Sequence, residues 1–544
     1  MKCEIRYRRG GQAETLAFSG AATRGALRME TAALTAVLET DEKGVLRLTL
    51  TPREPVELEG VTVALPFRFH RSDALFLNGY QSWTDSEELS VRSIMPGLLK
   101  TPRIGQKLFH LRAYGDYDFA HYSLVPGELH GWTYAYVRRD GEYRLFGSLS
   151  ERAGFTQLRF LAHQNRIELA RDCAGRVITE SYPALEVAQL VGAEDEVFDR
   201  WFALQGIAPP TAKPIRGYTS WYNYYQDISE EKILKNLDAL AASPVKFDVF
   251  QIDDGFQTHV GDWLSIDKTK FPNGLKCIAD RVRALGMTPG LWLNPFGCEY
   301  GSETAAQHPD WLLRGDDGEP IRAGANWGGF WVWDFYNPEA REYVRKCLQT
   351  AVRDWGFGLL KLDFLYAVCL HPTAERTRGE IMCEAMDFIR EATEGALILG
   401  CGVPLGAAFG KVDYCRIGCD VGLDYNDKLY MRIIHRERVS TKYSMRNTVF
   451  RRQLSGRAFL NDPDVFLLRH DNISLTWAQR ETLAAVNGQF GGVLFTSDDV
   501  SGYDEKQQAV LERTLYGDRA KKVSTKRVGT HHIVELDGKR IVLE

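Results

Sequence analysis

The segment GLLKLDFLYA (358–367) places two charged residues, Lys361 and Asp363, inside a run that is otherwise apolar. Short apolar runs bounded by glycine and polar residues are typical of the buried strands of a parallel sheet. Residues two apart on a strand point to the same side of it. We therefore expect the two charged side chains to project together from one buried strand, and the identity of their neighbours decides what they do.

Seven further apolar runs of similar length lie on either side of this segment, and helical patterns separate them. The helix candidates include 229–242, 338–355 and 379–395, and Pro338 stands at a favourable first helical position. Eight buried strands, each followed by a helix, predict a parallel (β/α)8 barrel. An open, doubly wound sheet is the alternative, but no glycine-rich phosphate turn opens the first unit. The predicted strands are 217–225, 247–254, 287–295, 358–366, 396–402, 412–420, 456–462 and 491–499.

The chain before and after the barrel has a different pattern. Short alternating segments such as 45–52 and 143–150, with the turn signal Arg139-Asp140-Gly141 between strands, predict an antiparallel sandwich. Residues 194–205 predict a connecting helix, and alternation returns around the hairpin signal Asp537-Gly538. We therefore predict an α/β protein with three domains: an N-terminal β-domain with a linker helix (1–205), a catalytic barrel (206–504) and a small C-terminal antiparallel β-domain (505–544).

Composition excludes several classes of partner. The chain has 544 residues and a formal net charge of -5, and its basic cluster at 432–438 is short and is predicted to be a solvated surface, so we expect no nucleic acid. No run of about 18 apolar residues predicts a membrane span, and MKCEIRYRRGG lacks the apolar core of a signal peptide. The ten cysteines form no C-x-x-C pair, which fits reduced thiols and a cytoplasmic location.

Carboxylates stand at the ends of four predicted strands. Asp253 and Asp254 end the second strand, Asp363 the fourth, Asp420 the sixth and Asp462 the seventh. Catalytic residues of (β/α)8 barrels come from the C-terminal ends of the strands. Any one of these residues alone fits a helix cap or a solvated loop equally well, but the whole set predicts an active site.

Lys361 and Asp363 suggest how one of these carboxylates works. A cation two residues away favours the ionised carboxylate and is expected to lower the pKa of Asp363. An ionised carboxylate in a water-poor pocket is suited to be a nucleophile. The alternative is a buried ion pair with a structural role only, but such pairs stabilise a protein less than apolar packing does.

Asp420 is the candidate for a second, proton-donating carboxyl group, which glycoside hydrolysis requires. It follows the apolar YCRIGC (414–419), a setting expected to raise its pKa by desolvation. Arg416, four residues earlier, is expected to hold substrate hydroxyls or an anionic neighbour. The alternative interpretation of Asp420 is a helix cap.

The remaining candidates suit sugar recognition. Asp253 and Asp254 are strong acceptors for vicinal hydroxyls, and a Mg²⁺ or Ca²⁺ site is the alternative, although no further cluster of oxygen ligands follows. Trp221, Trp263 and Trp292 lie at or just past strand ends, where an indole face stacks on a sugar ring or packs into the core. We expect no cofactor and no metal.

The chain resembles glycoside hydrolase family 36, the α-galactosidase family that also contains α-N-acetylgalactosaminidases and raffinose-type galactosyltransferases. The resemblance covers nearly the whole chain in collinear order. The motifs that carry it are NGYQSW (78–83), FQIDDGFQ (250–257), VGDWL (260–264), FPNGLKCIADRVRALGMTPGLWLNP (271–295), LLKLDFLYA (359–367), LGCGVPLGAAFGKVDYCRIGCDVG (399–422) and FLNDPDVFLLR (459–469).

The resemblance implies an N-terminal β-supersandwich, a (β/α)8 barrel and a C-terminal antiparallel β-domain, and a retaining double displacement on terminal α-galactosides. It implies that Asp363 is the nucleophile and Asp420 the acid/base, with Asp253 and Asp254 on the 4- and 6-hydroxyls of galactose. Many members are homo-oligomers in which an aromatic loop, here Tyr80–Trp83, reaches a neighbour's pocket. The sugar subsite would also include Lys361, Arg416, Trp221, Trp263 and Cys401.

The sequence also departs from the family pattern. The usual Lys-Trp-Asp-x-Asn is here Lys361-Leu362-Asp363-Phe364-Leu365, the usual Ser-Asp-Asn is Cys419-Asp420-Val421, and a Glu-Pro-Glu-like turn is Asn294-Pro295-Phe296. These changes bear on the substrate more than on the chemistry. An α-N-acetylgalactosaminidase, an α-galactosyl transglycosylase and a catalytically silent sugar-binding protein therefore remain alternatives, and the two retained carboxylates weigh against the last.

Overall fold

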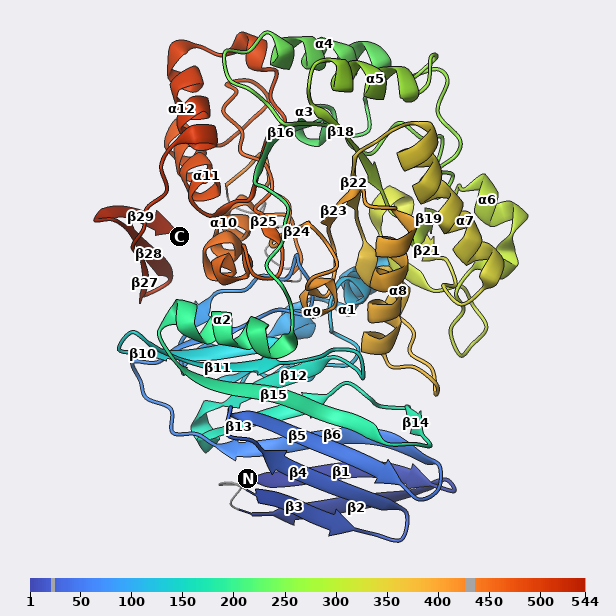
Figure 1. Ribbon diagram of the computed structural model, residues 1–544, viewed down its shortest axis with the longest axis vertical. Coiled ribbons are helices and arrows are strands. Elements are labelled where there is room, and N and C mark those ends of the chain that lie inside the picture. Colours follow the sequence, from blue (N-terminus) through green and yellow to red (C-terminus); the bar gives the residue numbers. More distant parts are fainter. Residues whose placement is uncertain (21–24, 426–435, 544) are drawn as a thin grey trace.

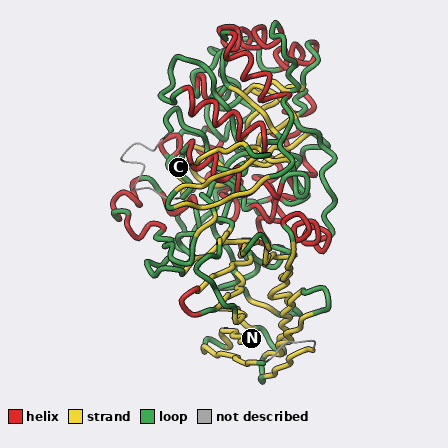
Figure 2. Tube along the Cα trace, turned by 90° about the vertical axis from the view of Figure 1, so that its left-hand side faces the viewer, coloured by secondary structure: helices red, strands yellow, loops and turns green. Residues whose placement is uncertain are grey.

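A computed structural model describes residues 1–20, 25–425 and 436–543. Strands make up the N-terminal part, and a larger body of strands and helices lies above it in Figure 1, with a small sheet at the C-terminus. Figure 2 shows the same division from the side, with strands and loops dominating the end that holds the N-terminus. The predicted fold class is confirmed in all three parts.

The larger body is a nearly closed barrel of eight parallel strands, in the order β25-β24-β23-β22-β18-β17-β16-β26. The two end strands approach each other, because the Gly492 amide donates to the Asn461 carbonyl (2.7 Å) and Phe466 forms a parallel bridge with Thr496. Seven of the eight predicted runs contain one of these strands, and the first run, 217–225, overlaps the end of β16. The strands are β16 (Ile215–Thr219), β17 (Val249–Ile252), β18 (Thr288–Leu293), β22 (Leu359–Leu362), β23 (Leu397–Gly400), β24 (Tyr414–Arg416), β25 (Leu460–Asp462) and β26 (Val493–Thr496).

Helix starts follow local capping chemistry. The Ser229 hydroxyl accepts the Lys232 amide, Asn337 caps a helix that has Pro338 in its first turn, and Thr377 forms a reciprocal capping box with Glu380. These starts confirm the three helix predictions. The main barrel helices are α4 (Glu230–Ala241), α5 (Lys276–Ala284), α7 (Pro338–Gln349), α8 (Arg378–Ala392), α10 (Thr441–Phe450) and α11 (Trp477–Phe490), with the short α3 (Trp221–Tyr224) and α9 (Leu405–Ala408) after β16 and β23.

An excursion between β18 and β22 was not predicted. It contains a three-stranded antiparallel sheet of β19 (Gly297–Glu299), β21 (Phe330–Val332) and β20 (Arg322–Gly324), and the short helix α6 (Glu303–Gln307). The turn that follows β20 carries Asn326 and Trp327. Because the excursion leaves the C-terminal end of β18, it covers the end of the barrel where active sites form.

Two antiparallel sheets pack into the N-terminal sandwich. Alternate residues of β5 (Val45–Pro52), namely Leu46, Leu48 and Leu50, are fully buried between them. One sheet contains β2 (Gln12–Ser19), β1 (Lys2–Arg9), β6 (Val56–Pro66), β13 (Arg166–Arg171), β12 (Thr156–Leu161) and β9 (Glu128–Trp132), with β14 (Val177–Ile178) on β6. The other contains β3 (Gly25–Glu30), β4 (Leu34–Thr40), β5, β15 (Tyr182–Gly192), β11 (Glu142–Ser148), β10 (Tyr134–Arg139), β7 (Ala74–Leu77) and β8 (Glu88–Leu89).

The connecting helix α2 (Glu194–Gln205) has the predicted bounds and joins the sandwich to the barrel. Its Trp201 is fully buried, donates its indole N–H to the Ser148 carbonyl (2.9 Å), and contacts the rings of Tyr134 in the sandwich and Phe409 in the barrel. The two parts therefore share one apolar interface.

The C-terminal sheet is formed by β27 (Val523–Val528), β28 (His531–Leu536) and β29 (Lys539–Leu543), with the predicted hairpin at Asp537 and Gly538, both at positive φ. Residues 505–516, which we assigned to this domain, form helix α12 (Glu505–Tyr516) before the sheet begins. The domain boundaries at 205 and 505 stay predictions.

Part of the basic cluster at 432–438 lies outside the described residues. Within the described part, Arg438 is buried and Arg436 is half-buried, with its guanidinium donating to the Asp85 carbonyl (2.6 Å). The expectation of a solvated surface is therefore wrong for these two residues, because the sandwich packs over them. In the ranges that the structure describes, no helix has the length and apolar character needed to cross a bilayer.

A long connection between β7 and β9 brings the sandwich into contact with the barrel. It includes the turn η1 (Gly97–Lys100), helix α1 (Arg103–Leu108) and the turn η2 (Leu111–Tyr114). The fully buried Arg451, just after α10, holds the start of this connection: its guanidinium donates to Asn78 Oδ1 (2.8 Å), the Ser82 carbonyl (2.6 Å) and the barrel carbonyl of Ile417 (2.8 Å).

The Arg451→Met variant should therefore unfold more easily, because it leaves three buried acceptors without a donor. We expect the free energy of unfolding to fall by about 3 kcal/mol or more, measured by urea denaturation. Arg281→Met is the control, since Arg281 pairs with Asp238 on the surface and should cost less than about 1 kcal/mol. Equal losses in the two variants would contradict the anchoring role.

Candidate active site

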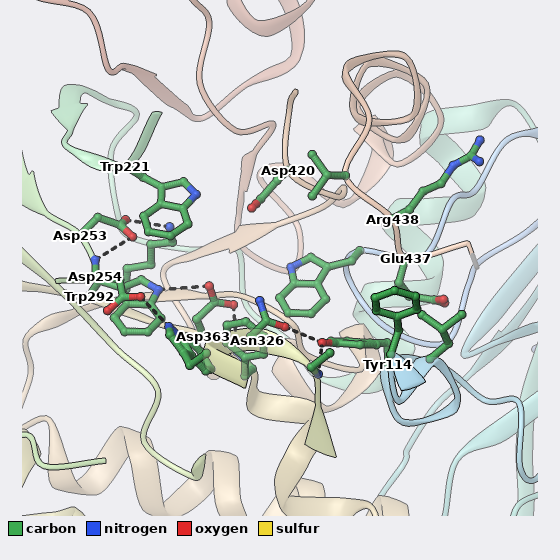
Figure 3. A pocket seen from close by; sticks show the side chains of 18 residues that line it. Tyr114, Trp221, Asp253, Asp254, Trp292, Asn326, Asp363, Asp420, Glu437 and Arg438 are labelled. Atoms are coloured by element: carbon green, nitrogen blue, oxygen red, sulfur yellow. Dashed lines mark hydrogen bonds and ion pairs between the residues drawn. The ribbon is translucent and has the colours of Figure 1, made fainter. Parts of the chain in front are cut away.

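A cavity of about 290 Å³ opens at the C-terminal ends of the barrel strands. Figure 3 shows its side chains converging from the barrel, from the excursion after β18 and from the sandwich connection. Six of the predicted site residues line it: Trp221, Asp253, Asp254, Lys361, Asp363 and Asp420. Trp292, which we considered for stacking, lines it as well.

The other three predicted residues lie behind this lining. Trp263 is buried and packs edge-on against Trp292, with ring centroids 5.7 Å apart. The Cys401 thiol is buried and accepts the indole N–H of Trp83 (3.2 Å). Arg416 is buried among carboxylates. These three residues support side chains that face the cavity.

Asp363 comes directly after β22 and is fixed by two donors. The Phe364 amide donates to its Oδ1 (2.9 Å), and the Trp292 indole donates to its Oδ2 (3.1 Å). Phe364 is held at a φ of 54°, an uncommon conformation for a residue with a side chain, and it too lines the cavity. Asp363 is thus rigidly positioned at the base of the cavity.

The electrostatic setting of Asp363 differs from the prediction. The Lys361 ammonium forms its ion pair with Asp253 Oδ2 (2.9 Å). Burial raises the pKa of Asp363 above its usual value, and Lys361 only offsets part of this effect. The expectation of a lowered pKa was wrong because the lysine side chain reaches the carboxylate that follows β17 rather than the one that follows its own strand.

Lys361 itself is held as a cation by this arrangement. Its burial would lower the pKa of the ammonium, but the contact with Asp253 reverses this and raises it. The same Asp253 oxygen also accepts from Gln251 (2.9 Å) and Thr219 (3.1 Å). The carboxylate of this buried ion pair is therefore well supplied with hydrogen-bond donors.

Asp254 lies beside this pair and has three neutral donors. Gln257 donates to its Oδ1 (2.6 Å), and Gln226 (2.9 Å) and the Trp327 indole (2.8 Å) donate to its Oδ2. Burial raises the pKa of Asp254 to about 6, and the negative charge of Asp253 adds to the effect. This carboxyl group is therefore poised to change charge near neutral pH.

Asp420 faces the cavity from the side opposite Asp363 (Figure 3). Its side chain is 35% exposed, and its Oδ1 accepts from Arg416 (2.7 Å). Asp420 therefore lacks the closed apolar setting that we expected from YCRIGC, although Cys415, Ile417 and Cys419 are themselves buried. Asp420 is thus the solvent-accessible carboxylate of the site.

Arg416 gathers three carboxylates around one guanidinium. Besides Asp420 it contacts Asp462 (2.9 Å) and Asp464 (2.9 Å), both buried. Burial raises the pKa of Asp464, and the Tyr222 hydroxyl donates to this carboxylate. Of the two roles expected for Arg416, the structure shows the one with anionic neighbours.

Comparison with known proteins relates the chain to a family. A sequence model of the Melibiase family matches residues 210–382. The A type blood α-D-galactosamine galactosaminidase of Flavonifractor plautii is 29% identical over 208 residues, which are 36% of this chain and 18% of that protein. The α-galactosidase Mel36A of Lactobacillus acidophilus is 34% identical over 142 residues, which are 25% of this chain and 17% of that protein.

The solved structure of the Thermus thermophilus α-galactosidase TtGalA, in complex with p-nitrophenyl α-D-galactopyranoside, is similar over much more of the chain. It is 28% identical, with a TM-score of 0.73, and the match covers 95% of this chain and 98% of that one. The chain is a glycoside hydrolase family 36 α-galactosidase-like protein. AgaA of Geobacillus stearothermophilus, of the same family, is 14% identical with a TM-score of 0.61 and shares the fold.

Several residues of this family 36 protein's cavity were missed in the sequence. Trp83 and Tyr114 come from the sandwich connection, and Asn326 and Trp327 from the excursion after β18. Tyr114 donates its hydroxyl to Asn326 (2.5 Å), which joins the two segments. NGYQSW was the one signal that pointed to the first segment, and the second had no pattern that could have marked it.

The Tyr80–Trp83 loop also differs from the prediction. Tyr80 is buried against Trp132 and Phe155 of its own sandwich, and Trp83 lines the cavity of its own chain. The loop is therefore a wall of this chain's cavity rather than an arm towards a neighbour. Among the described residues, no three His, Cys, Asp or Glu side chains are grouped so as to hold a metal ion.

The raised pKa of Asp254 predicts a cost in stability at neutral pH. The native state keeps this proton up to about pH 6, whereas the unfolded chain loses it near the usual value of 3.8. Protonated Asp254 therefore adds to the free energy of unfolding. This contribution is fully present below pH 3.8 and is lost as the pH rises through about 6.

The side-chain amide of the Asp254→Asn variant cannot titrate. The difference in free energy of unfolding between this variant and the wild type should therefore change in the variant's favour from about pH 4 to about pH 7.5. The gain should be about 3 kcal/mol, equivalent to about two pKa units, measured by urea denaturation at both pH values. Asp316→Asn, at a side chain that is 99% exposed, should show no such change. A pH-independent difference for Asp254→Asn would refute the buried titration.

Proposed function

We propose that this protein is a retaining, exo-acting α-galactosidase that cleaves terminal α-galactosidic linkages by double displacement. The observation that carries the proposal is that Asp363 and Asp420, which follow different strands, face one cavity. The adjacent residues Asp253 and Asp254 line the same cavity. Two carboxyl groups that flank a sugar carbon are the requirement of this chemistry. The Melibiase match and the similarity to TtGalA support the sugar.

Asp363 is the nucleophile in this proposal. The Phe364 amide and the Trp292 indole fix both of its oxygens, so the carboxylate is aligned before the substrate arrives. Because it is buried, little water competes for its lone pairs. It attacks the anomeric carbon as the glycosidic bond breaks, and a covalent glycosyl-enzyme forms.

Asp420 is the acid and then the base. In its protonated form it donates to the leaving glycosidic oxygen, and the resulting carboxylate then removes a proton from the water that releases the sugar. Its partial exposure suits this role, since the leaving group departs and water enters on this side. Arg416 fixes its orientation and stabilises the carboxylate form between the two steps.

Asp253 and Asp254 would bind the 4- and 6-hydroxyls of the galactose ring. Asp254 needs its ionised form to accept from both hydroxyl and amide donors, so binding should weaken as the pH falls below about 6. The indoles of Trp221 and Trp327 offer apolar faces to the C–H side of the ring at the same end of the cavity.

We also propose a cytoplasmic location, because all ten cysteines are free thiols and nine of them are buried. A homo-oligomer remains a candidate state. Sedimentation of the purified protein distinguishes it from a monomer.

Substitution of the two carboxylates tests the mechanism. Asp363→Ala and Asp420→Ala should each lower kcat for p-nitrophenyl α-galactoside, Asp363→Ala by more than about 10³-fold. Azide should rescue both variants, but with opposite products: a β-galactosyl azide from Asp363→Ala and an α-galactosyl azide from Asp420→Ala, both assigned by NMR. Asp316→Ala serves as the surface control. The mechanism fails if neither catalytic substitution changes turnover or if both azides have the same configuration.

A panel of p-nitrophenyl α-glycosides that differ only in the sugar tests the substrate. We expect kcat/KM to be highest for galactose and at least about 100-fold lower for its 4-epimer glucose, because an unpaired buried carboxylate costs binding energy. Asp254→Asn should reduce this discrimination. A preference for N-acetylgalactosamine would replace the galactosidase proposal with the galactosaminidase alternative, and transfer to added sugar acceptors in place of water would favour the transglycosylase.

A further inference from the structure

Exposed apolar side chains gather in one part of the sandwich connection. The structure describes 16 exposed large hydrophobic residues, and seven of them lie between Ile94 and Val125. Ile104 is 82% exposed, Leu108 67% and Leu99 58%, and α1, which carries the first two, has no buried residue. Soluble proteins rarely leave such side chains together in water without a partner.

The same part of the chain is uniformly cationic. Residues 89–115 contain five basic residues and no Asp or Glu, in a protein whose net charge is -5. Lys100, Arg103 and Lys107 are exposed and form no ion pair within the described part of the chain, whereas Arg112 pairs with Asp118. Within this part of the chain, the exposed apolar residues therefore alternate with basic residues and with no acidic one.

This surface continues into the cavity. Phe109 is half exposed and directly follows α1, and both Phe109 and Leu111 line the cavity that holds Asp363 and Asp420. Leu111 begins the turn η2 that ends at Tyr114, and Figure 3 shows Tyr114 and Glu437 on the far side of the cavity from Asp253. A substrate with its sugar at Asp253 would therefore extend its aglycone towards an apolar wall and then onto α1.

We propose that residues 94–112, here called the cationic apolar segment, bind an anionic lipid surface, and that the site takes a glycolipid with a terminal α-galactose. The substrate half of this proposal rests on the proposed function. Apolar side chains enter the boundary between headgroups and acyl chains, and the lysine and arginine side chains contact anionic headgroups. The lipid chain of the substrate then leaves the cavity along Phe109 and Leu111.

The charge pattern argues against a second copy of the chain as the occupant. A two-fold contact would bring the same surface of both copies together. Lys100, Arg103 and Lys107 of each copy would then meet the same cations, with no carboxylate between residues 89 and 115 to separate them. A negatively charged apolar partner satisfies both features, and an anionic bilayer is such a surface.

Vesicle pelleting tests the surface directly. The protein should sediment with vesicles of equal parts phosphatidylglycerol and phosphatidylcholine, but not with phosphatidylcholine alone. Ile104→Ser/Leu108→Ser and Lys100→Gln/Arg103→Gln/Lys107→Gln should each lower the partition coefficient at least about tenfold. Leu285→Ser/Val528→Ser, at exposed apolar residues elsewhere, is the matched control and should bind as the wild type does.

Turnover tests the substrate. The apolar variant Ile104→Ser/Leu108→Ser and the charge variant Lys100→Gln/Arg103→Gln/Lys107→Gln should both act more slowly on a diacylglycerol with a terminal α-galactose that is presented in the anionic vesicles. We expect hydrolysis at least about tenfold slower than by the wild type. Their kcat/KM for soluble p-nitrophenyl α-galactoside should stay within about twofold of the wild type, since none of the substituted side chains lines the cavity.

The proposal would be overturned if the wild type did not sediment with anionic vesicles, or if the partition coefficient of the control variant fell as far as those of the other two variants. It would also be overturned by a dimer that Ile104→Ser/Leu108→Ser dissociates, if neither the dimer nor the monomer binds vesicles. Absence of activity on the soluble galactoside would overturn the proposed function and the substrate half. Vesicle pelleting still decides the surface half in that case, so the two failures are distinguishable.

Discussion

The buried ion pair between Lys361 and Asp253 sets the charge balance of the cavity. It joins β22 to β17 across the intervening strand β18, with 2.9 Å between Lys361 Nζ and Asp253 Oδ2. A buried charge that loses its partner is strongly destabilising, so each residue requires the other. Since the ammonium pairs with Asp253, no ion pair reaches Asp363 from the described residues, and two hydrogen-bond donors hold its position.

Arg416 plays the corresponding part on the other side of the cavity. It keeps Asp420 next to the buried Asp462 and Asp464, so that one guanidinium organises three carboxylates. The site therefore consists of two groups of acids, each centred on one buried cation, with the sugar-sized space between them. One group is almost closed to water and the other is open at Asp420, and this difference supports the proposed division between a nucleophile and a proton carrier.

Local sequence patterns were enough for the barrel and for the positions of its carboxylates. Apolar runs of strand length and capping residues such as Asn337 depend on neighbours in the chain, and the C-terminal ends of parallel strands must meet at one end of a barrel. The contact of Lys361 with Asp253 and the exposure of Asp420 could not be predicted in this way. Both depend on side chains from other strands, whose separation in space has no local signal.

The segments that complete the cavity were the hardest to foresee for the same reason. Trp327 lies on an irregular turn, and Trp83 and Tyr114 lie more than 130 residues before Asp253, the first carboxylate of the cavity. Only tertiary packing brings their segments to it. The conformation of these segments is set by hydrogen bonds between residues far apart in the sequence, such as that between Tyr114 and Asn326.

The guanidinium of Arg451 makes the barrel and the sandwich depend on each other. A gene fragment that encoded the barrel alone would keep every carboxylate of the site, yet it would expose this arginine and lose the indole of Trp83 that closes one wall. Recombination would have to move both parts together to transmit a working enzyme. The heritable module is thus the pair of domains, including the connection between β7 and β9 that supplies Trp83.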